Sequence, residues 1–103
     1  MIKVTDSAAK QISISVDQMD GEPLPLRVAI NVQQDGSFHY NMGFDDNSRD
    51  GDTPFVEKNI NFVVDVATLP LVGGMTMDYV EIDGTQEIVF LNPNDPNYIA
   101  PTE

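Results

Sequence analysis

The chain has 103 residues, a length that suits one small domain with a single hydrophobic core. Seventeen acidic residues against five basic ones give a formal net charge of -12, which disfavours direct binding to nucleic acid or to anionic membrane surfaces. The sequence has no cysteine, and this excludes disulfides, thiolate catalysis and metal sites built from thiolates. No segment has the apolar run of a secretion signal or a membrane span, so we expect a cytoplasmic protein.

The first element that the sequence predicts is a helix over residues 5–19. Thr5 is a suitable N-cap, and Asp6 would lie in the first turn. The apolar residues at helical spacing are Ala8, Ile12, Val16 and Met19. Residues 11–16, however, alternate apolar side chains with serine, which is equally typical of a strand. Periodicity alone therefore leaves both interpretations open.

Two strands are predicted next, over residues 24–32 and 38–44, because apolar and polar side chains alternate in both. Asp35-Gly36 lies between them and is typical of a hairpin turn, so we expect the two strands to pair. The acidic residues 45–52 then form a solvated turn.

The rest of the chain predicts four short strands, over residues 55–58, 60–64, 75–82 and 86–91. Asp65 can cap a helical turn near 66–72, and Asp83-Gly84 joins the last two strands as a hairpin. One helix and several strands predict a mainly β (α+β) fold, with the helix covering a face of twisted antiparallel sheets. No linker or internal repeat indicates a second domain.

Residues 46–57 match the oxygen spacing of a calcium-binding loop. The matching residues are Asp46, Ser48, Asp50, Gly51 and Glu57. Such a loop needs a helix on each side, whereas strands are predicted here, and Pro54 would disturb the turn. We therefore expect an ordinary acidic connection between strands rather than specific calcium binding.

The remaining side chains give little support for catalysis, and we expect that the protein is not an enzyme. His39 is the single histidine, and it alternates with the apolar residues Phe38 and Tyr40. No serine lies in a nucleophile elbow, and close carboxylates are expected by chance in so acidic a chain. Gly73-Gly74 does not form a phosphate-binding pattern.

Taken together, six separated segments resemble the A-type iron-sulfur carriers, also called the HesB or IscA-like family. The segments are MIKVTDSAAKQI, EPLPLRVAI, DGSFHYNMGFDD, GDTPFVEKNINFVVD, TLPLVGGMTMDYVE and VFLNPN. They occur in the family's order and at its spacing over nearly the whole chain, and they favour the helix over residues 5–19. The resemblance implies a compact domain of two sheets in a distorted sandwich or barrel, with the helix packed alongside.

The family holds iron or a cluster with three cysteines, and the resemblance places the corresponding positions at Asp35, Ile99 and Pro101. Ile99 and Pro101 have no side-chain donor, and Asp35 offers a single hard carboxylate. The thiolate site of the family therefore cannot form, and we expect no cofactor and no metal. A weak mononuclear iron site at Asp35, assisted by His39 or Tyr40, stays open as an alternative.

Without a metal to order the end of the chain, we expect one domain over residues 1–94 and a flexible tail over residues 95–103. Cysteine-free proteins that look like this chain occur in the dissimilatory sulfite reductase gene clusters of sulfur-oxidising bacteria. The resemblance thus implies a non-catalytic accessory or regulatory role in sulfur oxidation. The alternative is a ligandless partner in iron-sulfur cluster assembly. Either role needs a protein partner, for which the charge predicts a basic surface, and the charge also favours a monomer.

Overall fold

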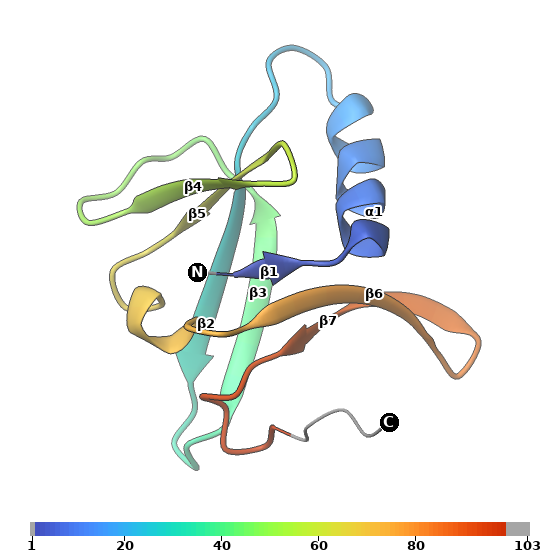
Figure 1. The fold of residues 1–103 in the computed structure, drawn as a ribbon. Helices are drawn as coiled ribbons and strands as arrows, with labels where there is room; N and C mark the ends of the chain where they lie inside the picture. Colours follow the sequence, from blue (N-terminus) through green and yellow to red (C-terminus); the bar gives the residue numbers. More distant parts are fainter. Residues whose placement is uncertain (1, 99–103) are drawn as a thin grey trace.

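The computed structural model describes residues 2–98, which form two sheets with one α-helix alongside (Figure 1). The elements in chain order are β1 (Lys3–Val4), α1 (Asp6–Asp17), β2 (Leu26–Val32), β3 (Phe38–Phe44), β4 (Thr53–Glu57), β5 (Ile60–Val64), the 3₁₀ helix η1 (Leu69–Leu71), β6 (Thr76–Ile82) and β7 (Thr85–Leu91). The predicted mainly β fold, with two sheets and an N-terminal helix, is therefore confirmed.

The strands pair into two mixed sheets, with the orders β3-β2-β5-β4 and β1-β6-β7. Two pairs are parallel, β2 with β5 and β1 with β6, while the other neighbours are antiparallel. The prediction of antiparallel sheets is therefore wrong for these two pairs and confirmed for the other three. Apolar alternation tells which face of a strand is buried but not which way its neighbour runs. β1 has only two residues, too few to show any alternation.

The N-terminal segment that could be either helix or strand is the helix α1. Thr5 caps it, and its Oγ1 accepts a hydrogen bond from the backbone N–H of Ala8 at 3.2 Å. Ile12 is buried, whereas Ile14 is 43% exposed. A strand would have placed Ile12 and Ile14 on the same face, so this difference is the mark of a helix. Within residues 2–98, no helix is long and apolar enough to cross a membrane.

The core lies between the two sheets, and α1 closes it by packing against β5 and β6 (Figure 1). The largest fully buried apolar side chains are Phe62, Ile2, Met75, Met77, Val28, Val64 and Val72. Burying each of them stabilises the fold by roughly 1.5–3 kcal/mol relative to an exposed side chain. These side chains come from residues 2–77, and the partly buried Ile88 and Phe90 of β7 pack against the same cluster.

Two of the tight turns follow the predicted Asp-Gly signals. Gly36 has a φ of 87°, and Asp83 and Gly84 have φ values of 51° and 81°, the left-handed backbone that hairpin turns require. The turn between β4 and β5 has no such signal, because Lys58 and Asn59 adopt φ values of 51° and 65° without a glycine. The predicted strand over residues 55–58 therefore ends one residue early.

The predicted helical turn near residues 66–72 is the 3₁₀ helix η1. Asp65 begins this turn, and its Oδ1 accepts a hydrogen bond from the backbone N–H of Thr68 at 2.8 Å. The buried Thr68 hydroxyl accepts a hydrogen bond from the N–H of Ile30 in β2 at 3.1 Å. This contact fixes η1 against the four-stranded sheet and places the segment that follows it.

Candidate functional site

The first predicted ligand position, Asp35, lies in the exposed turn between β2 and β3. Its Oδ1 accepts two hydrogen bonds from Ser37, at 2.9 Å from the backbone N–H and 2.6 Å from the hydroxyl. These bonds hold the pKa of Asp35 below its ordinary value. The backbone closes the turn as well, since the N–H of Gly36 donates to the carbonyl of Gln33 at 2.9 Å. The Asp35 carboxylate therefore stabilises its own turn.

His39 and Tyr40, the two proposed helpers of Asp35, lie next to each other on β3 and point to opposite faces. His39 is exposed. Tyr40 stacks on Phe90 with ring centroids 4.8 Å apart, and its hydroxyl donates to Oδ2 of Asp95 at 2.7 Å. Partial burial, followed by the hydrogen bond to Asp95, raises the pKa of Tyr40. The Tyr40 hydroxyl therefore fastens the C-terminal segment.

The structure consequently separates the three residues of the alternative iron site. The Asp35 carboxylate faces Ser37, the Tyr40 hydroxyl faces Asp95, and His39 is on the other side of β3. Among the residues that the structure describes, no three histidine, aspartate or glutamate side chains gather as a metal site requires. Weak iron binding by Asp35 alone stays a prediction.

The segment after β7 is held by a clamp formed by Asn92 and Asn94. Asn92 is 1% exposed, and its Nδ2 donates to the carbonyl of Leu71 at 2.8 Å while its Oδ1 accepts from the backbone N–H of Asn94 at 3.0 Å. Nδ2 of Asn94 donates to the carbonyls of Leu71 and Gly73, at 3.1 and 2.9 Å. The motif that the sequence shows as Asn-Pro-Asn is therefore a structural fastening of the chain end.

The clamp and the Tyr40–Asp95 hydrogen bond bring the C-terminal segment to the end of the sandwich that carries the Asp35 turn (Figure 1). Residues 95–98 form a turn, in which the N–H of Tyr98 donates to the carbonyl of Asp95 at 2.9 Å. Ile99 and Pro101, the other predicted ligand positions, lie outside the described residues. The predicted flexibility of residues 95–103 stays a prediction.

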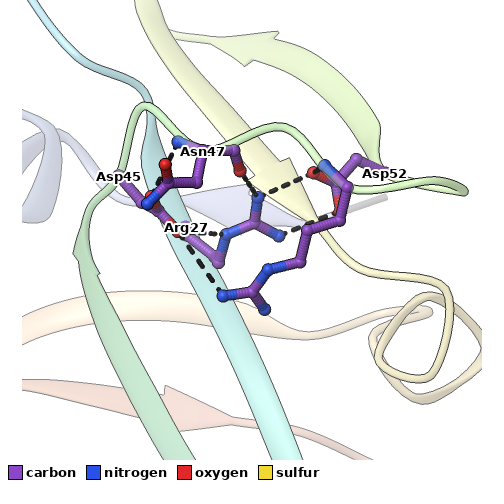
Figure 2. Close-up of polar contacts among 5 residues, drawn as sticks. Arg27, Asp45, Asn47 and Asp52 are labelled. Carbon is purple, nitrogen blue, oxygen red and sulfur yellow. Dashed lines mark hydrogen bonds and ion pairs between the residues drawn. The ribbon is translucent and has the colours of Figure 1, made fainter.

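A second polar cluster, which the sequence analysis did not find, surrounds Arg27 on β2. Figure 2 shows its guanidinium enclosed by Asp45, Asn47 and Asp52 from the loop between β3 and β4. Nε donates to Asp45 at 2.8 Å, Nη1 and Nη2 donate to the two oxygens of Asp52 at 3.0 and 2.7 Å, and Nη2 donates to the Asn47 carbonyl at 2.9 Å. Arg27 is only 8% exposed. The positive charge of Arg27 is therefore paired with carboxylates of the protein itself.

The electrostatics of this cluster follow from its geometry. The hydrogen bond from Arg27 lowers the pKa of Asp52 to about 2. The pKa of Asp45 is also lowered, first by the backbone N–H of Asn47 and then by Arg27. The pKa of Arg27 is raised, mainly by Asp52. A bidentate arginine–carboxylate pair of this kind is among the stronger charged contacts in proteins, because both partners are oriented and partly desolvated.

The partners of Arg27 differ from the residues of the calcium-like spacing, which are Asp46, Ser48, Asp50, Gly51 and Glu57. Residues 46–57 run from the loop after β3 into β4, so the structure has strands where we predicted them rather than the helices of a calcium-binding loop. Oxygens of the loop do surround a cation, but the cation is the guanidinium of Arg27, and Asp45 and Asp52 supply the carboxylates. The signal that could have found it is the arginine itself, which interrupts the apolar strand LPLRVAINV.

Comparison with known proteins identifies relatives of this chain by sequence and by fold. The family model for iron-sulphur cluster biosynthesis matches residues 1–97. An iron-sulfur cluster insertion protein, ErpA, of Actinobacillus pleuropneumoniae is 37% identical over 94 residues, which are 90% of this chain and 80% of the relative. Escherichia coli SufA, described as involved in biosynthesis of iron-sulfur clusters, superposes with a TM-score of 0.77 at 21% identity, over 96% of this chain and 86% of its own. IscA with a 2Fe-2S cluster superposes with a TM-score of 0.73 at 18% identity, over 90% and 86% of the two chains.

The fold and the matched residues define a protein of the A-type carrier class. The chain belongs to the iron-sulphur cluster biosynthesis family. Its own residues, however, do not fit an iron-sulfur cluster, because clusters are held by thiolates and the sequence has no cysteine. At the turn where the resemblance places a ligand, the Asp35 carboxylate is bonded to Ser37 instead.

Proposed function

We propose that this protein is a non-catalytic member of the A-type carrier family that keeps the scaffold without holding a cluster. The observation that carries the proposal is a complete carrier fold on a sequence without cysteine. The clamp at Asn92 and Asn94 supports it, because the segment that would lead to the two C-terminal ligands is still anchored. A scaffold that keeps its shape and has no ligands is suited to contact other proteins rather than to carry metal.

The role that we propose for this scaffold is accessory or regulatory, in bacterial sulfur oxidation. The support is the resemblance to cysteine-free proteins of sulfite reductase gene clusters, together with the absence of thiolates. In this role the protein works in the cytoplasm as a monomer, and it binds a protein partner through a basic surface of that partner. The net charge of -12 supports both points, because it repels a second copy and attracts a cationic face.

The second candidate is a ligandless partner within iron-sulfur cluster assembly. The observation that favours it is the 37% identity to a protein named for cluster insertion. In this role the retained surface would dock onto carriers or onto proteins that receive clusters. Weak binding of one iron at Asp35 is compatible with this candidate, but the hydrogen bonds from Ser37 compete with the metal for the same carboxylate.

Deletion of the gene in its own host tests the first role, and complementation with the wild-type gene is the control. We expect the deletion strain to oxidise stored sulfur more slowly and the complemented strain to recover. Normal sulfur oxidation in the deletion strain would contradict this role. Affinity capture then separates the two candidates, because sulfur-oxidation components among the partners favour the first and cluster-assembly factors favour the second.

A further inference from the structure

An open cleft lies between the two sheets, on the side where each sheet ends in a free edge. β3 is an edge strand of the four-stranded sheet, and β7 is an edge strand of the three-stranded sheet. Residues from both strands, from β6 and from α1 line the cleft, whose volume is about 310 Å³. Met42 and Phe44 of β3 face Tyr79 and Ile88 of the other sheet across it. The core of the sandwich is therefore accessible from this side.

Apolar side chains form part of the lining of the cleft, and some of them are exposed. Tyr79 and Ile88 pair across β6 and β7 and are half-buried, as is Phe44. Met42 is 43% exposed, although the alternation of β3 would direct it towards the core. Farther along, towards Phe38, the Tyr40–Phe90 stack fills the space between the sheets. Beside Met42, residues 2–98 leave the cleft of about 310 Å³ instead, into which an apolar group from outside can fit.

β3 lacks the features that normally protect an edge strand from pairing with other chains. Its sequence, FHYNMGF, has no lysine, arginine, aspartate, glutamate or proline. The opposite edge of the same sheet, β4, is shorter and carries Pro54 and Glu57. Proline and charged residues on an edge strand discourage the addition of another strand, and their absence on a long edge permits it. Of the two edge strands of this sheet, β3 is therefore the one that can accept a further strand.

The charge around the cleft indicates which kind of segment would pair there. Among the described residues that line it, Glu87 is the one charged residue, but it pairs with Val80, so its side chain lies on the face of the sheet opposite Tyr79 and Ile88. Glu81 follows Tyr79 on the same face of β6, and it pairs with Gln86 at the rim of the cleft. The net charge of -12 adds an attractive field for a cation. The complementary segment is basic, with a bulky apolar side chain.

We propose that the cleft between β3 and β7 binds an extended, basic segment of a partner protein. The segment adds to the β3 edge as a further strand, with one apolar side chain against Met42 and Tyr79 and a lysine or arginine near Glu81. From the proposed function this inference takes only the idea that the protein acts by binding another protein. It holds equally for a partner in sulfur oxidation and for one in cluster assembly.

A peptide titration followed by amide shifts in NMR spectra tests the proposal. The probe is a capped seven-residue peptide that alternates lysine with leucine and valine, and the control peptide replaces leucine and valine by serine at the same charge. We expect saturable shifts centred on residues 40–44, 79–81 and 85–89, and binding of the control that is weaker by at least about tenfold. Equal affinity for both peptides, shifts centred on β4, or no saturable shift would overturn the proposal.

Two matched variants separate the cleft from the general charge. Met42→Lys places a cation in the cleft, and Val56→Lys places the same charge on β4, where the valine is 64% exposed. We expect Met42→Lys to weaken binding by about tenfold or more and Val56→Lys to change it by less than about twofold. Equal weakening in both variants would show that only net charge matters and would overturn the proposal.

Failure of the cleft proposal can be distinguished from failure of the proposed function. Both exchanged positions are well exposed, so both variants should keep the dispersed amide spectrum of the folded protein. A deletion strain without a phenotype would contradict the role in sulfur oxidation and leave the cleft result unchanged. Loss of selective peptide binding would contradict the cleft and leave the deletion phenotype unchanged.

Discussion

At the scale of single residues, Arg27 is the side chain that holds the loop between β3 and β4 against the outer face of the four-stranded sheet. It points away from the core, between Leu26 and Val28, which are buried on the other face. It is nevertheless covered, because the loop between β3 and β4 folds over it and contributes Asp45 and Asp52. Removal of the guanidinium would leave Asp45 and Asp52 without the cation that lies between them, and only the exposed Arg49 would remain near Asp45, at 4.0 Å.

We therefore expect Arg27→Met to lower the free energy of unfolding by about 3–5 kcal/mol, the range for breaking a buried ion pair by removal of one partner. Arg49→Met is the matched control, since Arg49 is 59% exposed and reaches Asp45 only at 4.0 Å. Its expected cost is below about 0.5 kcal/mol. Urea denaturation measures both values, and similar losses in the two variants would contradict the role given to Arg27.

The same cluster predicts how stability depends on pH. Folding depresses the pKa of Asp52 to about 2 and lowers that of Asp45, so their stabilisation is present above the unfolded value of about 3.9 and is lost as pH falls through the folded values. Protonation of other carboxylates also relieves repulsion in this acidic chain, so the comparison must be between variants. Between about pH 4 and pH 2, stability should fall more steeply in the wild type than in Arg27→Met. Parallel curves would show that Arg27 does not set these pKa values.

At the scale of elements, the clamp after β7 joins the end of the chain to η1 and the loop that follows it. Asn92 is buried and uses both its donor and its acceptor, so it fixes the direction in which the chain leaves β7. Gly74 adds a close approach, because a Cβ atom there would lie 3.3 Å from Cγ of Pro93, and its φ of 79° also favours glycine. The C-terminal segment is thus placed by hydrogen bonds from side chains and by close packing, neither of which involves a metal.

Asn92→Ala should destabilise the protein by about 2–3 kcal/mol, because it leaves the Leu71 carbonyl without this donor and opens a small buried space. Asn97→Ala is the control, since Asn97 is exposed and its hydrogen bond to Asp95 uses the backbone N–H. Thermal unfolding measures the difference, and amide exchange near residues 92–95 should quicken in Asn92→Ala alone. Unchanged exchange would mean that the clamp does not hold the segment.

Elements differ in how far the sequence could predict them. The alternation in β2, β3, β6 and β7 and the Asp-Gly turns are local signals, and the structure confirms those strands. The parallel pairing of β2 with β5 could not be predicted, because the partner of a strand depends on contacts far along the chain. The helix–strand ambiguity of residues 11–16 was resolved by the family resemblance, and burial of Ile12 with exposure of Ile14 agrees with it.

In the candidate site, too, the contacts between side chains could not be predicted from the sequence. The sequence identified Asp35 as a carboxylate without thiolate neighbours, but it did not show that Ser37 occupies that carboxylate. The acidic loop was recognised by its oxygen spacing, while its true partner, Arg27, lies on a strand 18 residues away from Asp45. Contacts of this range appear only after the strands have been assembled.

At the scale of the whole molecule, the central claim is that a carrier scaffold has been kept while its cluster chemistry has been lost. The fold superposes on IscA and SufA over most of its length, and the sequence has no cysteine with which to bind a cluster. If the loss is confined to the ligands, then returning thiolates to Asp35, Ile99 and Pro101 should restore cluster binding to an otherwise suitable scaffold.

Anaerobic reconstitution with iron and sulfide, followed by absorption spectra and iron analysis, tests this claim most directly. The wild type should remain colourless and free of stoichiometric iron, whereas the triple variant Asp35→Cys, Ile99→Cys and Pro101→Cys should gain iron and the visible absorption of a thiolate-bound cluster. Stoichiometric iron in the wild type that Asp35→Ala abolishes would contradict the claim that the ligands are lost. A folded triple variant that stays colourless would contradict the claim that the scaffold is kept.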